Sequence, residues 1–249
     1  MSGTRKSRLT FMFLANTLRP VMDLLMAREW SGSEKLPRDT GFIVCPNHVT
    51  EIDPVAVGHF LYNQGIMPHF MAKASLFNVP VVGSTLRAAR MIPVERMTSG
   101  ASRTLALARE IVDEGGGIIV YPEGTLTRDP DLWPMKGRTG AARLALLTGA
   151  PIVPIAHWGA QDVFPRYAKR LHVWPRKTVR LVVGEPVDIS EFRDRPLTAA
   201  VLDEVTERIM SALTVMVAEL RQEPAPTERW DPRVKKQRLT GRDFEDGKP

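Results

Sequence analysis

The chain has 249 residues, of which 43% are hydrophobic and 25% are charged, a composition that is ordinary for a globular protein with a sizeable core. Its net charge of +6 and its pI near 9.7 indicate an anionic partner, and nucleic acid, anionic lipid headgroups and a phosphorylated substrate all qualify. A single cysteine, Cys45, excludes an internal disulfide and a zinc site made of cysteines, and it fits a reducing cytoplasm.

The first 30 residues combine basic side chains with a helical apolar pattern. The residues at 8–28 repeat apolar side chains at helical spacing, behind a basic entry. The longest uncharged run, Leu9–Leu18, has ten residues, too few for a bilayer span of about 20. This pattern suits a helix on a membrane surface or one packed on the protein's own core. The predicted apolar face comprises Phe11, Leu14, Ala15, Leu18, Met22 and Leu25.

Short apolar runs alternate with longer helical patterns through the middle of the chain. This alternation predicts an α/β fold, with a mostly parallel central sheet and helices on both faces. The predicted strands cover residues 41–45, 69–72, 90–94, 116–122, 150–157 and 179–184. The predicted helices cover residues 54–63, 80–90, 99–114, 140–148 and 197–220.

The composition changes again from Arg221 onward, where charged residues and proline replace core residues. This change predicts a tail that is flexible or laid over the surface. The chain therefore divides into an amphipathic segment at 1–30, an α/β domain at 31–222 and a charged tail at 223–249.

The loop after the first predicted strand, "PNHVTEIDP", holds His48 and Asp53. Asp before Pro54 is a favoured helix N-cap, which is the simpler interpretation of Asp53. In the functional interpretation, Asp53 orients His48, which removes a proton from a hydroxyl. No G-x-S-x-G nucleophile is present, so a histidine base would act on the substrate's own hydroxyl.

The loop "YPEGTLTRD" after the strand at 116–122 holds Glu123, Gly124 and Arg128. It is either a simple glycine turn or an anion site, in which backbone N–H groups and Arg128 hold a phosphate ester. Other cations that could converge on such a site are Lys73, Arg96 and Lys136.

Four blocks in this order resemble the glycerolipid acyltransferases, specifically the 1-acylglycerol-3-phosphate acyltransferases. Each block alone is weak, but four in order over residues 30–190 are a specific signal. The blocks are Asn47-His48-x4-Asp53 (the HX4D motif), Val94-Glu95-Arg96, Tyr121-Pro122-Glu123-Gly124-Thr125-Leu126-Thr127 and Ile152-Val153-Pro154-Ile155.

The resemblance implies acyl transfer from acyl-CoA or acyl carrier protein to the hydroxyl of lysophosphatidate, giving phosphatidate. It implies no metal, no cofactor and no covalent acyl-enzyme. His48 would be the general base and Asp53 its orienting partner. The acceptor-phosphate site would comprise Arg96, Glu123, Gly124 and Thr125.

One residue departs from the family pattern. The arginine that usually follows E-G-T is replaced by Leu126, so other cations would have to bind the phosphate. Arg128 is the predicted replacement, with Lys73 as helper. The change leaves open another lysophospholipid or lipid alcohol as acceptor, or a different positional preference on glycerol.

Because both implied substrates are amphiphiles, the resemblance favours membrane docking for the N-terminal segment. We therefore expect a peripheral protein on the cytoplasmic face of the cell membrane. A non-catalytic basic module that binds lipid or nucleic acid is the alternative from another class. Nucleic acid is not expected as a partner, because no recognised binding motif is present.

Overall fold

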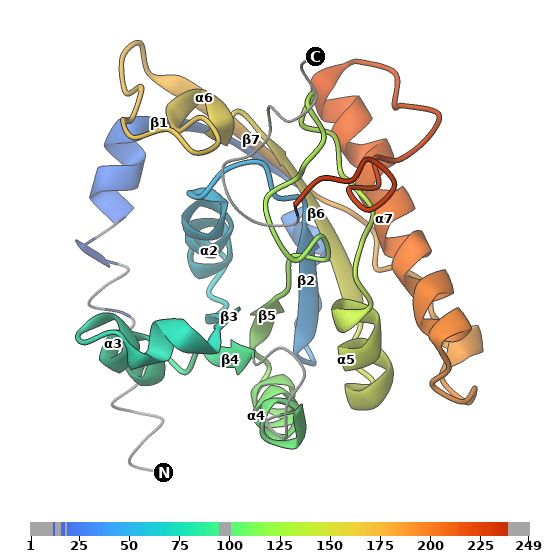
Figure 1. The fold of residues 1–249 in the computed structure, drawn as a ribbon. Coiled ribbons are helices and arrows are strands. Elements are labelled where there is room, and N and C mark those ends of the chain that lie inside the picture. Colours follow the sequence, from blue (N-terminus) through green and yellow to red (C-terminus); the bar gives the residue numbers. More distant parts are fainter. Residues whose placement is uncertain (1–11, 13–15, 18, 95–100, 239–249) are drawn as a thin grey trace.

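A seven-stranded mixed sheet forms the centre of this computed structural model, which describes residues 12, 16–17, 19–94 and 101–238 (Figure 1). The strand order is β1-β7-β6-β2-β5-β3-β4. All neighbouring pairs are parallel except β6 with β7. The strands are β1 (Met26–Ser31), β2 (Phe42–Pro46), β3 (Pro68–Lys73), β4 (Ile92–Val94), β5 (Gly117–Ile119), β6 (Ile152–Trp158) and β7 (Lys177–Val183).

Helices cover both faces of this sheet, which confirms the predicted fold class (Figure 1). Along β2, Phe42 and Val44 pack with α2, whereas Ile43 and Cys45 pack with α4, α5 and α7. This alternation explains why β2 is apolar throughout: a central strand buries both of its faces. The helices are α2 (Asp53–Asn63), α3 (Val82–Ala88), α4 (Ala101–Asp113), α5 (Gly140–Thr148), α6 (Ala160–Val163) and α7 (Ala199–Arg221).

The N-terminal segment differs from its prediction in two ways. Its helical residues end at 25, and residues 26–31 form strand β1, which the sequence patterns did not indicate. Within the helix, Met22 and Leu25 pack against Ala56 of α2 and Val179 of β7. The described part of the predicted apolar face is thus used by the protein's own core, while Phe11, Leu14, Ala15 and Leu18 lie outside the described residues.

The first part of the tail lies over the surface, which was one of the two predicted alternatives. The backbone N–H of Lys136 donates to the carbonyl of Trp230, at 2.9 Å, and Lys136 pairs with Asp231 at 3.0 Å. These contacts bind the tail to the loop that precedes α5. None of the helices within the described ranges combines the length and the apolar composition that a bilayer span requires.

Candidate active site

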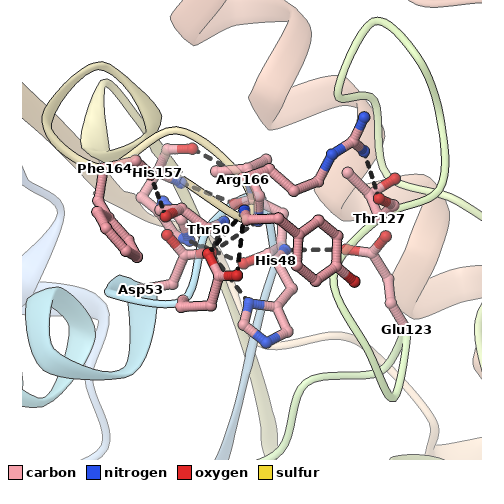
Figure 2. Close-up of polar contacts among 12 residues, drawn as sticks. His48, Thr50, Asp53, Glu123, Thr127, His157, Phe164 and Arg166 are labelled. Carbon is pink, nitrogen blue, oxygen red and sulfur yellow. Dashed lines mark hydrogen bonds and ion pairs between the residues drawn. The ribbon is translucent and has the colours of Figure 1, made fainter. Parts of the chain in front are cut away.

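The predicted pair is in place at the carboxyl end of β2. His48 Nδ1 lies 3.0 Å from Asp53 Oδ2, and the carboxylate is fully buried. An ionised carboxylate at this distance favours a proton on Nδ1, which leaves Nε2 with a free lone pair. The imidazole is partly exposed, at 14% of its side chain, and its second ring nitrogen points away from Asp53 (Figure 2).

Asp53 is held by the loop that precedes it. Its Oδ2 also accepts hydrogen bonds from the backbone N–H groups of Val49 and Thr50, at 2.6 and 2.8 Å. The prediction that Asp53 is the N-cap of α2 is therefore wrong. Asp53 is the first helical residue, its neighbour Ile52 holds the cap position, and its carboxylate turns back to the loop. The helix N-terminus still favours a negative charge at this position.

Glu123 fastens the histidine loop to a second loop. One carboxylate oxygen accepts from the backbone N–H of His48 at 2.9 Å, and the other accepts from the backbone N–H of Met135 at 3.0 Å. The side chain is fully buried, and this burial raises the pKa of Glu123 to about 8, against the lowering effect of the two backbone bonds. Glu123 therefore positions His48 in this structure.

The aromatic ring of Tyr121 forms a wall of the site. It stacks on the His48 imidazole, with ring centroids 4.0 Å apart and an interplanar angle of 27°. Its hydroxyl is buried, with no hydrogen-bond partner among the described residues. Burial, followed by the charge of Asp53, raises the Tyr121 pKa well above its usual value. The neutral phenol thus contributes its ring to the site rather than a charge.

Asn47 and His157 tie the end of β2 to the end of β6. Asn47 Nδ2 donates to the carbonyl of His157 at 3.0 Å, and the N–H of His157 donates to Asn47 Oδ1 at 2.9 Å. His157 Nε2 donates to the carbonyl of Asn47 at 2.7 Å and lies 3.8 Å from Asp53 Oδ2. Both side chains are buried, so this pair fixes the base of the histidine loop.

The segment after α6 closes over the same loop. Thr50 Oγ1 donates to the carbonyl of Phe164, and the N–H of Tyr167 donates to the Glu51 carboxylate at 3.1 Å. Arg166 donates to the carbonyl of Thr127 (Figure 2) and to the carbonyl of Asp129. The sequence patterns did not predict these contacts, because they join residues more than 35 positions apart.

Of the predicted substrate-binding residues, the structure brings Glu123, Gly124, Thr125 and Arg128 to the loop beside His48, where the backbone N–H of Thr127 donates to the His48 carbonyl at 2.7 Å. Gly124 is exposed and has a φ of 72°, and a Cβ there would meet the Arg138 side chain. Thr125 is partly exposed. Arg96 and the Lys73 side chain lie outside the described part of the chain.

Arg128 and Leu126 are both buried. Arg128 is fully enclosed, at 0% exposure, and Leu126 is 6% exposed. In this conformation the Arg128 guanidinium does not reach a surface on which a lipid phosphate could rest. Arg128 therefore does not occupy the open position that the prediction of a replacement phosphate ligand requires.

Arg221, at the end of the C-terminal helix α7, joins this helix to the second loop and to β6. The Arg221 guanidinium lies over the rings of Trp133 and Trp158, at 4.0 and 4.4 Å from their centroids. Its Nη1 also donates to the carbonyl of Asp131 at 2.7 Å. The end of α7 thus stabilises the loop at 121–135 through these contacts.

Known proteins are similar to this chain in sequence and in fold. The family model described as Acyltransferase matches residues 27–158. A 1-acyl-sn-glycerol-3-phosphate acyltransferase of Bacillus subtilis (strain 168) is 30% identical over 205 residues, which cover 80% of this chain and 94% of that protein. An enzyme of the same description from Borreliella burgdorferi is 27% identical over 183 residues, 72% of this chain and 70% of that one.

A solved structure gives the same architecture. The crystal structure of the 1-acyl-sn-glycerophosphate (LPA) acyltransferase PlsC from Thermotoga maritima superposes with a TM-score of 0.61, at 23% identity, over 86% of this chain and 83% of that one. The family model covers more than half of the chain, including the His48–Asp53 loop, Glu123 and His157. The chain therefore belongs to the Acyltransferase family, and it is an enzyme of that family.

Proposed function

We propose that the enzyme transfers a fatty acyl group from acyl-CoA or acyl carrier protein to the free hydroxyl of 1-acylglycerol-3-phosphate, giving phosphatidate. The observation that carries this proposal is the His48–Asp53 pair, with Nδ1 3.0 Å from a carboxylate that the backbone N–H groups of Val49 and Thr50 hold in place. The description of the Bacillus and Borreliella relatives as 1-acyl-sn-glycerol-3-phosphate acyltransferases supports the choice of acceptor.

The proposed chemistry begins with the unprotonated Nε2 of His48. Nε2 removes the proton of the acceptor hydroxyl as its oxygen bonds to the thioester carbonyl carbon. Asp53 stabilises the imidazolium that forms, and backbone N–H groups stabilise the oxyanion. When the carbon–sulfur bond breaks, the imidazolium returns its proton to the departing thiolate. The step needs no metal and no serine or cysteine nucleophile.

The acceptor phosphate would lie beside the loop at 123–125. Gly124 and Thr125 are the accessible members of this loop, and Lys73 at the end of β3 and Arg96 after β4 would supply positive charge. Arg128 would remain buried and would make the electrostatic potential at the loop more positive, without contacting the ligand. Glu123 would hold His48 rather than the phosphate.

A different acceptor is the second candidate, and Leu126 favours it. An apolar, buried side chain stands where the family pattern has an arginine, so selection for a phosphate monoester is weaker in this loop. A lysophospholipid with a larger headgroup, a lipid alcohol, or another position on glycerol would then be used by the same His48–Asp53 chemistry.

A substrate panel tests both candidates. Purified enzyme is given acyl-CoA or acyl carrier protein donors with lysophosphatidate, lysophosphatidylglycerol and monoacylglycerol, and the position of the new ester is read by mass spectrometry. The proposal expects phosphatidate as the main product, and it expects no product with His48→Ala. Preference for a neutral or larger acceptor would replace the first candidate with the second.

We also place the enzyme at the cytoplasmic face of the membrane as a peripheral protein. Its acceptor lies in the bilayer, and the net charge of +6 is suited to an anionic leaflet. In the helix at 19–25, Val21 and Leu24 remain 47% and 77% exposed. These two residues, rather than the predicted face that includes Met22 and Leu25, are the described part of this helix that can meet lipid.

A further inference from the structure

The segment between α6 and β7 carries an exposed apolar and basic tip. Every residue of 169–176, "KRLHVWPR", is exposed. Leu171 and Val173 are 47% and 41% exposed, and Trp174 is 87% exposed. Large apolar side chains gathered in this way usually mark an interaction site rather than ordinary surface.

The positive charge of the same segment indicates what kind of partner it binds. No acidic residue lies between Asp162 and Glu185, whereas this interval holds six cations. The six are Arg166, Lys169, Arg170, Arg176, Lys177 and Arg180. Tryptophan flanked by lysine and arginine is the composition that lies at the boundary between lipid headgroups and acyl chains.

The position of the segment joins it to the N-terminal helix. Arg176 Nη2 donates to the carbonyl of Met26 at 3.0 Å and also to the carbonyl of Asp23. The exposed Val21 and Leu24 of the helix therefore lie on the element to which the segment is fastened. In Figure 1 the gold segment runs beside the blue helix, on the side of the molecule away from α5 and α7.

The base of the segment reaches the active site. Phe164 accepts from Thr50, and the backbone N–H of Tyr167 donates to Glu51, both in the loop between His48 and Asp53. The exposed tip begins at residue 169, two positions after Tyr167. A surface bound by this tip would therefore lie next to the loop that holds the catalytic pair.

We propose that residues 169–176 are a membrane-docking loop, which inserts Leu171, Val173 and Trp174 into the interface of an anionic phospholipid bilayer. Lys169 and Arg170 bind the headgroups beside it. The docking loop holds the neighbouring His48–Asp53 loop close to the leaflet that contains the acceptor. This last point rests on the proposed function, whereas the docking itself does not.

The single buried cysteine allows a direct test without an activity measurement. Cys45 is fully enclosed in the core, so Val173→Cys can be labelled selectively with an environment-sensitive fluorophore in the full chain. Vesicles of phosphatidylcholine with phosphatidylglycerol should shift its emission to the blue. Val215→Cys, on the exposed face of α7, is the matched control, and its label should not respond. No shift at 173, or equal shifts at both positions, would overturn the proposal.

Co-sedimentation with the same vesicles measures the contribution of each side chain. Trp174→Ala should lower the partition coefficient about tenfold or more, because an aromatic side chain carries ~150 Å² or more of surface into the interface. Lys169→Ala with Arg170→Ala should lower it by about fivefold for each charge on mixed vesicles, and by much less on pure phosphatidylcholine. Arg143→Ala with Arg193→Ala removes the same charge elsewhere and should have little effect.

Other results would contradict the docking loop. Unchanged partition of Trp174→Ala would exclude lipid as its partner. If Trp174→Ala instead changes the oligomeric state on size-exclusion chromatography, while its vesicle binding equals that of the wild type, the partner of the loop is a second copy of the chain. If vesicles are bound as expected but no lysolipid is acylated, the docking loop stands and the proposed acceptor is wrong.

Discussion

The Glu123 carboxylate accepts a hydrogen bond from the backbone N–H of His48 at 2.9 Å, across 75 positions of sequence. Its other oxygen accepts from Met135. A buried acid whose two oxygens accept from the backbone of two different loops is a positioning element, and this role gives the glutamate of the Y-P-E-G-T block a structural task.

The buried acid makes stability depend on pH. The pKa of Glu123 is raised from 4.5 to about 8, so the folded protein keeps a proton that the unfolded chain releases between these values. The free energy of unfolding contributed by this group therefore falls as pH rises from 4.5 to 8. Urea unfolding at several pH values should show this decline in the wild type and not in Glu123→Gln. Parallel pH profiles of the two proteins would contradict it.

Tyr121 should act through its ring. Its hydroxyl is buried without a described partner, so Tyr121→Phe should leave stability unchanged or raised by up to about 1 kcal/mol, with kcat close to wild type. Tyr121→Ala removes the ring stacked on His48 and should lower both kcat and stability. The free energy of unfolding should fall by about 3 kcal/mol, as for other large aromatic truncations. Thermal unfolding and initial rates measure both. A large loss of kcat in Tyr121→Phe would show that the hydroxyl takes part.

Asp53→Asn separates charge from shape. The amide oxygen can still accept from Val49 or Thr50, but it cannot stabilise an imidazolium at His48. We expect kcat to fall by ~10²-fold or more, with a much smaller change in the KM for acceptor. Circular dichroism checks that the variant is folded. A change in KM alone would indicate that Asp53 serves binding and not proton transfer.

The location of the phosphate can be tested with two arginines. If surface cations bind it, Arg96→Ala raises the KM for acceptor about tenfold and leaves the KM for the acyl donor unchanged. Arg128→Ala should mainly lower the melting temperature, because its guanidinium is fully buried. Arg128→Lys keeps the charge as a control. An acceptor-specific KM effect at Arg128 and none at Arg96 would restore Arg128 as the direct ligand.

Local pattern predicted most of the fold, and its failures have physical reasons. Central strands such as β2 and β6 are apolar on both faces and were identified. Strand β1, "MAREWS", is an edge strand in which every side chain after Met26 is exposed or partly exposed, so it lacks the apolar run that marks a buried strand. The N-terminal helix was predicted over residues 8–28, but its helical residues end at 25, and its pattern alone could not decide whether Met22 and Leu25 face lipid or core.

The site was predictable where its residues are close in sequence. His48 and Asp53 are five positions apart, and their loop identifies them. His157 and Arg166 reach the same site from β6 and from the segment after α6, more than 100 positions away from Asn47 and Asp53. The parallel pairing of β2 with β6 brings His157 beside Asn47, and Arg166 is held there by its bonds to the carbonyls of Thr127 and Asp129. The positioning role of Glu123 could not be predicted from the sequence either, because the fold decides which backbone N–H groups its carboxylate meets.

The most direct test of the central claim is single-turnover acyl transfer by His48→Gln under donor and acceptor saturation. Glutamine keeps a polar side chain of similar reach but cannot take a proton, and the fold should persist because His48 contacts Glu123 through its backbone N–H. The proposed mechanism predicts a rate lower by ~10²–10⁴-fold, with the melting temperature and acceptor binding nearly unchanged. A rate close to that of the wild type would contradict His48 as the general base.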